Sequence, residues 1–203
     1  MKIAVIGASG NAGSRITAEL ARRGHQVTAI ARNPERIAEH ASVTPAKGDV
    51  MDPSGLARLV TAHDAAISSV HFLASDPVKL IAAAKESKVG RYLVVGGAGS
   101  LEVAPGVRLV TTPGFPVAYK AEAEAGAAFL DLLRAEQELN WTFLSPSALF
   151  VAGQRTGRFR LGTDQLLTTA DGKSSISFED FAVALADEIE RPAHIRQRFT
   201  VGY

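Results

Sequence analysis

Short apolar runs alternate with longer stretches of helical periodicity along most of the chain. Ile3–Ile6 is a continuous apolar run that ends in a glycine, which is typical of a strand buried on both faces. Ile16 and Leu20 then recur at helical spacing, and the cations and glycine of residues 22–24 indicate the end of that helix. The start of the chain therefore predicts a buried strand followed by a helix.

The same pattern repeats as far as residue 144. The further predicted strands are Val27–Ile30, Val43–Ala46, Ala65–Ser69, Arg91–Val95 and Trp141–Leu144. The further predicted helices open at Asp52-Pro53, at Asp76-Pro77 and at about Val117, and the last two run to about Ser87 and Gln137. Strands separated by helices cannot form hairpins, so we expect an α/β fold with a doubly wound parallel sheet, the Rossmann fold. Ligands bind such sheets at the carboxyl ends of the strands.

The pattern loosens after Phe150. Ser177 is predicted to cap a helix that runs to about Glu190, since apolar residues recur every four positions along it. We expect residues 1–203 to form a single domain, with residues 151–203 as a C-terminal elaboration over the mouth of the sheet.

Composition narrows the possible chemistry. The chain has 46% hydrophobic residues, 22 Lys and Arg against 21 Asp and Glu, and no cysteine. Cysteine nucleophiles, iron–sulfur clusters and disulfides are thereby excluded, and a charge of +1 provides no field for a nucleic acid. The histidines lack the spacing of metal ligands, and the first apolar run is too short for a signal peptide. We expect a cytoplasmic monomer or homodimer that acts on a small molecule, without a metal, nucleic acid or membrane partner.

A glycine-rich turn joins the first strand to the first helix. It follows the pattern G-x-x-G-x-x-G, which suits a pyrophosphate lying against backbone amides at a helix N-terminus. In this interpretation the first glycine turns the chain, the second admits the phosphates and the third lets helix and strand pack closely. The predicted dinucleotide-binding residues of the turn are Gly7, Ser9, Gly10, Asn11, Ala12 and Gly13.

The end of the second strand carries a cation where an NAD-binding protein has an acid. Arg32 and Asn33 stand at this place, with Arg36 one helical step beyond. Arginine there favours the 2′-phosphate of NADP, so NADPH is predicted to be preferred over NADH, although Arg32 is also explained as a solvated cation of the loop. Asp49 and Val50 end the third strand and are candidates for the adenine site, although Asp49 is equally explained as a turn aspartate that binds its own backbone.

These segments together carry a family resemblance. GASGNAG, ARNPER, KGDVMD, VVGGAGS and PSALF resemble the atypical short-chain dehydrogenases, in particular the branches named for NADH-flavin reductase, biliverdin-IXβ reductase and NmrA. The resemblance extends over essentially the whole chain. It implies a Rossmann fold and an NAD(P) cofactor but not a particular substrate, because one fold supports many reactions.

Several residues are candidates for the nicotinamide end of the site. Gly96 and Gly97 follow the fifth strand and would allow a ring to approach closely, and Ser69 lies at the end of the fourth strand. The resemblance implies that Pro146 and Ser147 wall the nicotinamide pocket.

The candidate proton donors are Ser100, His71, Tyr119 and Lys120. His71 is also explained as a structural histidine, and Tyr119 as a surface residue. In the main short-chain dehydrogenase branch a Tyr-x-x-x-Lys pair transfers the proton, but here Lys120 directly follows Tyr119. Adjacent side chains on a helix point about 100° apart, so the usual pair is absent.

A site with this phosphate turn but without the usual acid and base suits acceptors that absorb charge in their own conjugated system. We therefore expect an NADPH-dependent reductase of a planar acceptor such as a flavin or quinone. Two alternatives stay open: a non-catalytic NAD(P) sensor of the NmrA kind, and an enzyme that resembles sugar-nucleotide epimerases or dehydratases.

Overall fold

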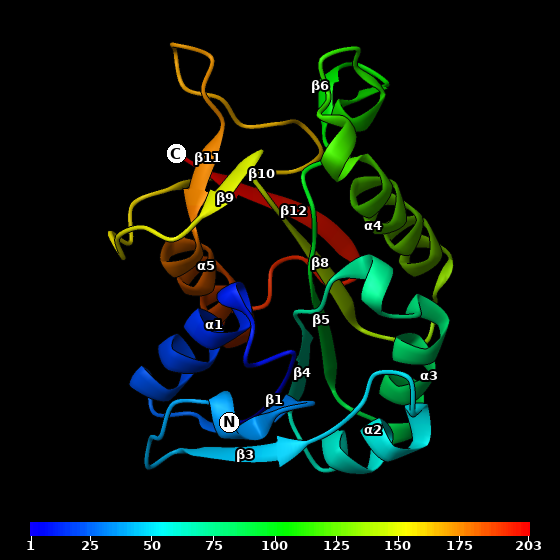
Figure 1. Cartoon of the computed structure of the whole chain (residues 1–203), viewed down its shortest axis with the longest axis vertical. Helices are drawn as coiled ribbons and strands as arrows, with labels where there is room; N and C mark the ends of the chain where they lie inside the picture. Colours follow the sequence, from blue (N-terminus) through cyan, green and yellow to red (C-terminus); the bar gives the residue numbers. More distant parts are fainter.

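The computed structural model describes all 203 residues and has the predicted doubly wound sheet at its centre (Figure 1). Its eight strands lie in the order β10-β12-β8-β5-β4-β1-β2-β3, and every neighbouring pair is parallel except β10 with β12. The strands are β1 (Lys2–Ile6), β2 (Gln26–Ala31), β3 (Val43–Lys47), β4 (Ala65–Ser68), β5 (Arg91–Val95), β8 (Trp141–Pro146), β10 (Arg160–Gly162) and β12 (Gln197–Gly202).

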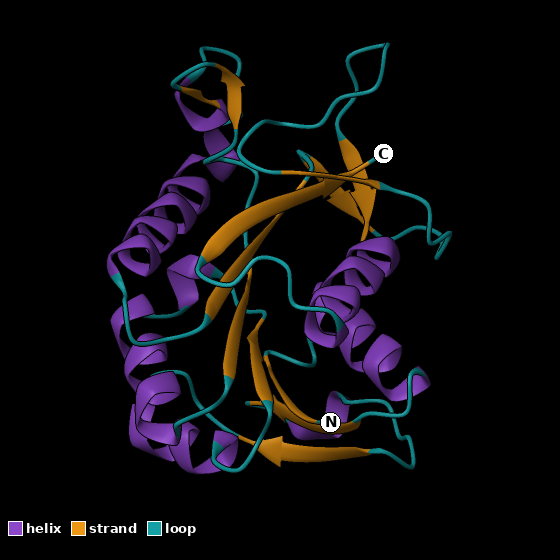
Figure 2. Cartoon of the chain, turned by 180° about the vertical axis from the view of Figure 1, so that it is seen from behind, coloured by secondary structure: helices purple, strands orange, loops and turns teal.

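Helices cover both faces of this sheet, as Figures 1 and 2 show from opposite sides. The helices are α1 (Asn11–Arg22), α2 (Pro53–Val60), α3 (Pro77–Ser87), α4 (Val117–Ala135) and α5 (Phe178–Glu190), with short 3-10 turns η1 (Pro34–Arg36), η2 (Phe72–Ala74) and η3 (Leu109–Thr111). In β1, Ile3 and Val5 pack into the core beneath α1 and α5, whereas Ala4 and Ile6 face α2, α3 and α4. Both faces of the strand are buried, which explains its continuous apolar run.

Three helices begin at the residues that the sequence predicts. The Asp52 carboxylate accepts from the Gly55 N–H at 2.9 Å, and the Asp76 carboxylate accepts from the Val78 N–H at 2.9 Å. The Ser177 hydroxyl accepts from the Asp180 N–H at 3.0 Å at the start of α5. Each cap satisfies an amide that has no partner within its own helix.

The C-terminal segment contributes more to the fold than its sequence suggests. We predicted residues 151–203 to lie over the mouth of the sheet, but β12 is inserted between β8 and β10, and α5 packs beside α1. Phe199 and Val201 of β12 are fully buried, so this strand completes the core. The small sheet of β9 (Leu149–Val151) with β11 (Ser175–Ser177), and the hairpin of β6 (Glu102–Ala104) with β7 (Val107–Arg108), lie outside the main sheet.

The order of strands places a crevice beside β1. This strand pairs with β2 on one side and β4 on the other, so the direction of winding changes between β1 and β4. Ligands of doubly wound sheets bind outside the carboxyl ends of the strands at such a point. Gly7 follows β1 and Ser69 follows β4, and both therefore stand at the crevice. None of the helices combines the length and the apolar character needed to cross a bilayer.

Candidate active site

The glycine turn has the geometry that its sequence predicts. Gly7 has φ +84°, and a Cβ there would lie 2.2 Å from the carbonyl oxygen of Ser69. A Cβ on Gly13 would lie 2.2 Å from the carbonyl oxygen of Gly7. Only glycine at position 7 therefore leaves room for the Ser69 carbonyl after β4, and only glycine at position 13 lets α1 pack against the end of β1.

The N-terminus of α1 is left open to a ligand. Its N-cap, Gly10, makes no side-chain hydrogen bond, and the first turn holds no acidic residue, whereas α2, α3 and α5 all have side-chain caps. The first amides of a helix have no intrahelical partner, and here they are those of Asn11, Ala12 and Gly13. Unpartnered amides and the helix dipole favour an anion, so this end of α1 fits a dinucleotide's diphosphate.

A hollow, which we call the cofactor hollow, runs from this turn across the carboxyl ends of β1, β2 and β4. It brings together nine of the predicted residues: Gly7, Ser9, Gly10, Arg32, Asn33, Arg36, Val50, Ser69 and His71. Its other lining residues, which sequence reasoning missed, are Ile6, Ile30, Ala31, Gly48, Val70 and Ala74. Most of these are apolar residues at strand ends, which suit the faces of an adenine ring.

Arginine side chains without acidic partners surround the adenosine end of the cofactor hollow. Arg32 and Arg36 are exposed and form no ion pair, although most arginines of the chain do. Arg32 also lines an adjoining hollow with Arg58 and Asp49. The Asp49 carboxylate accepts from the Met51 N–H at 2.9 Å, which is the turn arrangement that the sequence left open.

Two further hollows continue from the cofactor hollow. The inner hollow shares Gly10, Ser69, Val70 and His71 with the cofactor hollow, and the outer hollow, of about 590 Å³, shares Phe72, Tyr119 and Glu122 with the inner one. The rest of the inner lining is Asn11, Ala12, Val95, Gly96, Phe150 and Phe178. The predicted Gly97 lines the outer hollow, together with Leu109, Phe115, Pro116, Leu149 and Leu166 among others. The three hollows therefore adjoin one another along one crevice.

Phe72, Phe150 and Phe178 contribute aromatic rings to the lining of the inner hollow. Phe72 stacks on Phe143 with centroids 6.5 Å apart and meets Phe129 edge-on at 6.2 Å. A Cβ on Gly126 would lie 2.6 Å from the Phe72 ring, so the glycine makes room for it. On the opposite side Phe150 and Phe178 meet at 4.6 Å.

Glu122 was not predicted from the sequence and is central to the site. Its carboxylate accepts from the N–H groups of Phe72 at 2.7 Å and Leu73 at 3.0 Å, and its Oε1 lies 3.3 Å from the His71 Nδ1. Glu122 therefore connects α4 to η2, and it contacts His71 where the cofactor hollow meets the inner hollow. Glu122 stands three positions after Tyr119, on the same face of α4, and this spacing is the signal that could have found it.

Comparison with known proteins gives this arrangement a family. A family model described as NAD(P)H-binding matches residues 7–192. The chain belongs to the NAD(P)H-binding family. The matched residues include the glycine turn, the arginines after β2 and the residues of both further hollows.

Three solved structures of other proteins are similar to this chain over its whole length. A protein from Burkholderia pseudomallei described as a "putative exported protein" is 46% identical, with a TM-score of 0.90 and all of its own length covered. A "putative epimerase" from Bacteroides thetaiotaomicron is 40% identical, with a TM-score of 0.95 and 96% covered. A "putative NADH-flavin reductase" from Streptococcus pneumoniae TIGR4 is 38% identical, with a TM-score of 0.81 and 99% covered. The three names imply no common activity.

Five predicted residues line none of the hollows, and a sixth, Asp49, lines only the hollow that adjoins the cofactor hollow. One of the five, Gly13, is where α1 packs against the turn. Ser100 is 5% exposed, and its hydroxyl accepts from the Arg198 Nη1 at 3.3 Å, so it is buried against a cation and does not face an acceptor. Pro146 and Ser147 are buried, and the Ser147 hydroxyl donates to the Val201 carbonyl at 3.1 Å. Lys120 is exposed and lines none of the hollows. The other four residues stand close in sequence to residues of the lining, but their own side chains do not enter the hollows.

Tyr119 and His71 remain at the site. The Tyr119 side chain lines both the inner and the outer hollow, and its hydroxyl has no hydrogen-bond partner in the protein. The residue is 68% exposed. His71 is also exposed and lines the cofactor and inner hollows. No group of three or more His, Asp or Glu side chains is placed to hold a metal ion.

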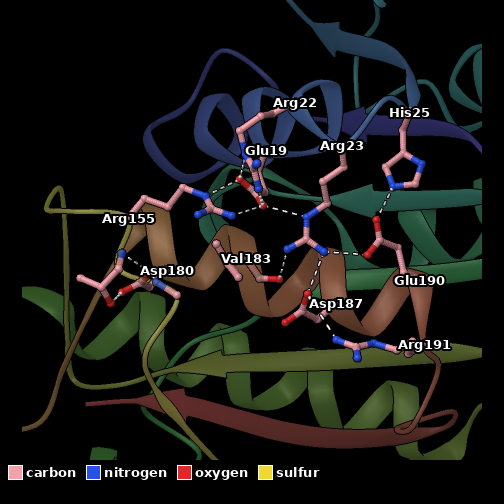
Figure 3. A network of polar contacts seen from close by, with 12 residues as sticks. Glu19, Arg22, Arg23, His25, Arg155, Asp180, Val183, Asp187, Glu190 and Arg191 are labelled. Carbon is pink, nitrogen blue, oxygen red and sulfur yellow. Dashed lines mark hydrogen bonds and ion pairs between the residues drawn. The ribbon is translucent and has the colours of Figure 1, made fainter.

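A buried ion-pair network holds α1 in place behind the site (Figure 3). The Glu19 carboxylate is 4% exposed and accepts from Arg22 and Arg23 on its own helix and from Arg155 of the loop after β9. Arg23 also donates to Asp187 of α5 at 2.7 Å. Burial by itself raises the pKa of Glu19, but the three arginines outweigh it and hold that pKa well below its usual range. The helix that carries the open amides is thereby fixed to α5 and the C-terminal segment.

Proposed function

We propose that this protein is an NADPH-dependent reductase that transfers hydride to a planar conjugated acceptor such as a flavin or quinone. The observation that carries the proposal is the aromatic inner hollow, which adjoins the cofactor hollow and contains no Tyr-Lys pair. An acceptor that holds the added charge in its own ring system needs orientation from the protein more than acid catalysis.

The residues of the cofactor hollow would hold the dinucleotide from two ends. Amides of Asn11 and Ala12, which line the inner hollow next to the shared Gly10, would bind the diphosphate. Arg32 and Arg36 of the cofactor hollow would bind the 2′-phosphate that distinguishes NADPH from NADH. When bound, NADPH supplies the hydride. Ser69 and Gly96 line the space in which the nicotinamide end would lie.

The residues of the inner hollow would orient the acceptor. Phe72, Phe150 and Phe178 offer ring faces and edges to a planar molecule. His71 and Tyr119 are the two side chains at this boundary that carry a transferable proton, and both are within the lining of the inner hollow.

Cofactor preference can be tested by replacing Arg32. Hydrogen bonds to charged groups contribute about 1.5–3 kcal/mol, so Arg32→Ala should weaken NADPH binding by roughly 10-fold to 150-fold. Binding of NADH should change little, because it has no 2′-phosphate. Calorimetric titration of both dinucleotides measures this. Arg158→Ala is the matched control, since Arg158 is exposed and lines none of the hollows. An equal loss for NADH and NADPH would contradict the assignment of Arg32 to the 2′-phosphate.

Hydride transfer can be tested by stopped-flow oxidation of NADPH in the presence of flavins and quinones. Turnover with a member of either class supports the reductase. Tight dinucleotide binding without turnover of any acceptor refutes it and favours the NmrA-like sensor. Release of a rearranged sugar nucleotide, with no net oxidation of NADPH, would instead support the activity that the name of the B. thetaiotaomicron relative implies.

A further inference from the structure

The charges around the inner and outer hollows point to a narrower class of acceptor. We infer that this protein selects uncharged planar acceptors and discriminates against those that carry a phosphate or carboxylate, and that Glu122 is the residue responsible. The inference rests on the proposed reductase function and specifies the substrate of the same site.

Cations and anions are separated along the crevice. The cofactor hollow is lined by Arg32 and Arg36, which suit the phosphates of a dinucleotide. Neither the inner nor the outer hollow has a lysine or arginine in its lining, and Glu122 is the one acidic residue in both. The side chain of Glu122 is 30% exposed, so its charge is only partly screened by water. The cofactor hollow and the adjoining N-terminus of α1 therefore attract phosphate, whereas the outer hollow, in whose lining Glu122 is the only charged residue, repels it.

Three cations outside the lining of the outer hollow pair with acids. Lys173 stands between two lining residues, but its Nζ lies 2.7 Å from an Asp171 carboxylate oxygen and its side chain is 80% exposed. Arg108 and Arg134 both pair with Asp131. Lys120, next to Tyr119, forms no ion pair, but its exposed side chain lines none of the hollows, so the lining itself offers no cation to an anionic acceptor.

The rest of the lining favours an apolar ring system. Phe72 is shared by both hollows, and Phe115 and Leu166 lie in the outer one. An isoalloxazine or quinone ring can bury its faces here, but a phosphate on its side chain would lie near Glu122 without a partner. Anions that are desolvated beside a like charge are strongly disfavoured.

Riboflavin and its 5′-phosphate, FMN, form the sharpest pair of probes because they share the same reacting ring and differ in the phosphate. With NADPH as the donor and at low ionic strength, we expect kcat/KM to be at least about tenfold higher for riboflavin than for FMN. The ratio of the two kcat/KM values should decrease as salt is added. Equal or faster reduction of FMN would overturn the inference while leaving the reductase intact. Failure of both flavins and of neutral quinones, with NADPH still bound, would overturn the reductase and the inference together.

Replacing the Glu122 carboxylate by an amide measures how much its charge contributes to the discrimination against FMN. Glu122→Gln keeps an oxygen that can accept from the Phe72 N–H but removes the charge. The ratio of kcat/KM for riboflavin to kcat/KM for FMN should therefore fall at least about threefold, because kcat/KM for FMN rises. Glu124→Gln is the matched control on the same helix, since Glu124 is exposed and lines neither hollow. A ratio unchanged in Glu122→Gln would refute the assignment to Glu122. If that variant does not fold, a wild-type ratio that is insensitive to salt refutes it equally.

Discussion

Glu19→Gln is the substitution whose effect follows most directly from the structure. The Glu19 carboxylate belongs to α1, the helix that follows the glycine turn, and accepts five N–H bonds from three arginines, at 2.7–3.0 Å. A glutamine has the same shape, but it carries no charge and would turn an amide N–H toward at least one guanidinium. The variant therefore tests charge pairing separately from packing.

The expected loss of stability is moderate. Leaving the charged donors around a buried carboxylate position without their acceptor costs about 1–3 kcal/mol, because Arg22 and Arg155 are partly solvated and Arg23 keeps Asp187 and Glu190 as partners. At this chain length each kcal/mol lowers Tm by about 2–4 °C, so Tm should fall by roughly 2–12 °C. Urea unfolding at pH 7 gives the free energy directly. Glu39→Gln is the control, because Glu39 is exposed and makes no hydrogen bond or ion pair through its side chain.

The difference between wild type and variant should also depend on pH. The arginines hold the native pKa of Glu19 far below its ordinary value of 4.5, so the unfolded chain takes up a proton first as pH falls. The contribution of Glu19 to stability is therefore complete above pH 4.5 and is lost progressively below it. Glutamine does not titrate, so the difference should narrow by up to about 1.4 kcal/mol per pH unit under acid conditions. A loss below about 1 kcal/mol at pH 7, or a difference independent of pH, would refute this account.

Two further substitutions test the geometry of the site. Gly13→Ala places a Cβ 2.2 Å from the Gly7 carbonyl oxygen, so it should cost about 1–3 kcal/mol in urea unfolding and weaken dinucleotide binding. Gly114→Ala, whose Cβ would meet nothing within 4 Å, should leave both measurements unchanged, and similar behaviour of the two variants would contradict the tight turn. Lys120→Gln should leave kcat for NADPH oxidation within about twofold, since Lys120 lines none of the hollows; a tenfold loss would show that Lys120 reaches the reacting atoms.

Much of the fold and the cofactor end of the site is predictable because the signals are local. The apolar run of β1, the glycine turn and the aspartates that cap α2 and α3 each act through residues a few positions away. Arg32 follows β2 directly, and the parallel arrangement of β1 and β2 carries it to the glycine turn. Short-range stereochemistry and the winding rule are enough to place these groups.

The acceptor end depends on contacts between distant segments. Glu122 meets Phe72 across 50 positions, and Ser100 meets Arg198 across 98. Nothing in the sequence near Ser100 shows that its hydroxyl turns away from the crevice toward β12, and nothing near β12 predicts that it enters the sheet beside β8.

The sequence by itself determined the α/β alternation, the glycine turn and the place of the arginines beyond β2, because each is encoded within one strand, turn or helix. Only the tertiary structure decided which side chains line the inner and outer hollows. Their positions depend on how η2 packs against α4 and how the C-terminal strand completes the sheet, and these contacts form only when the whole chain is folded.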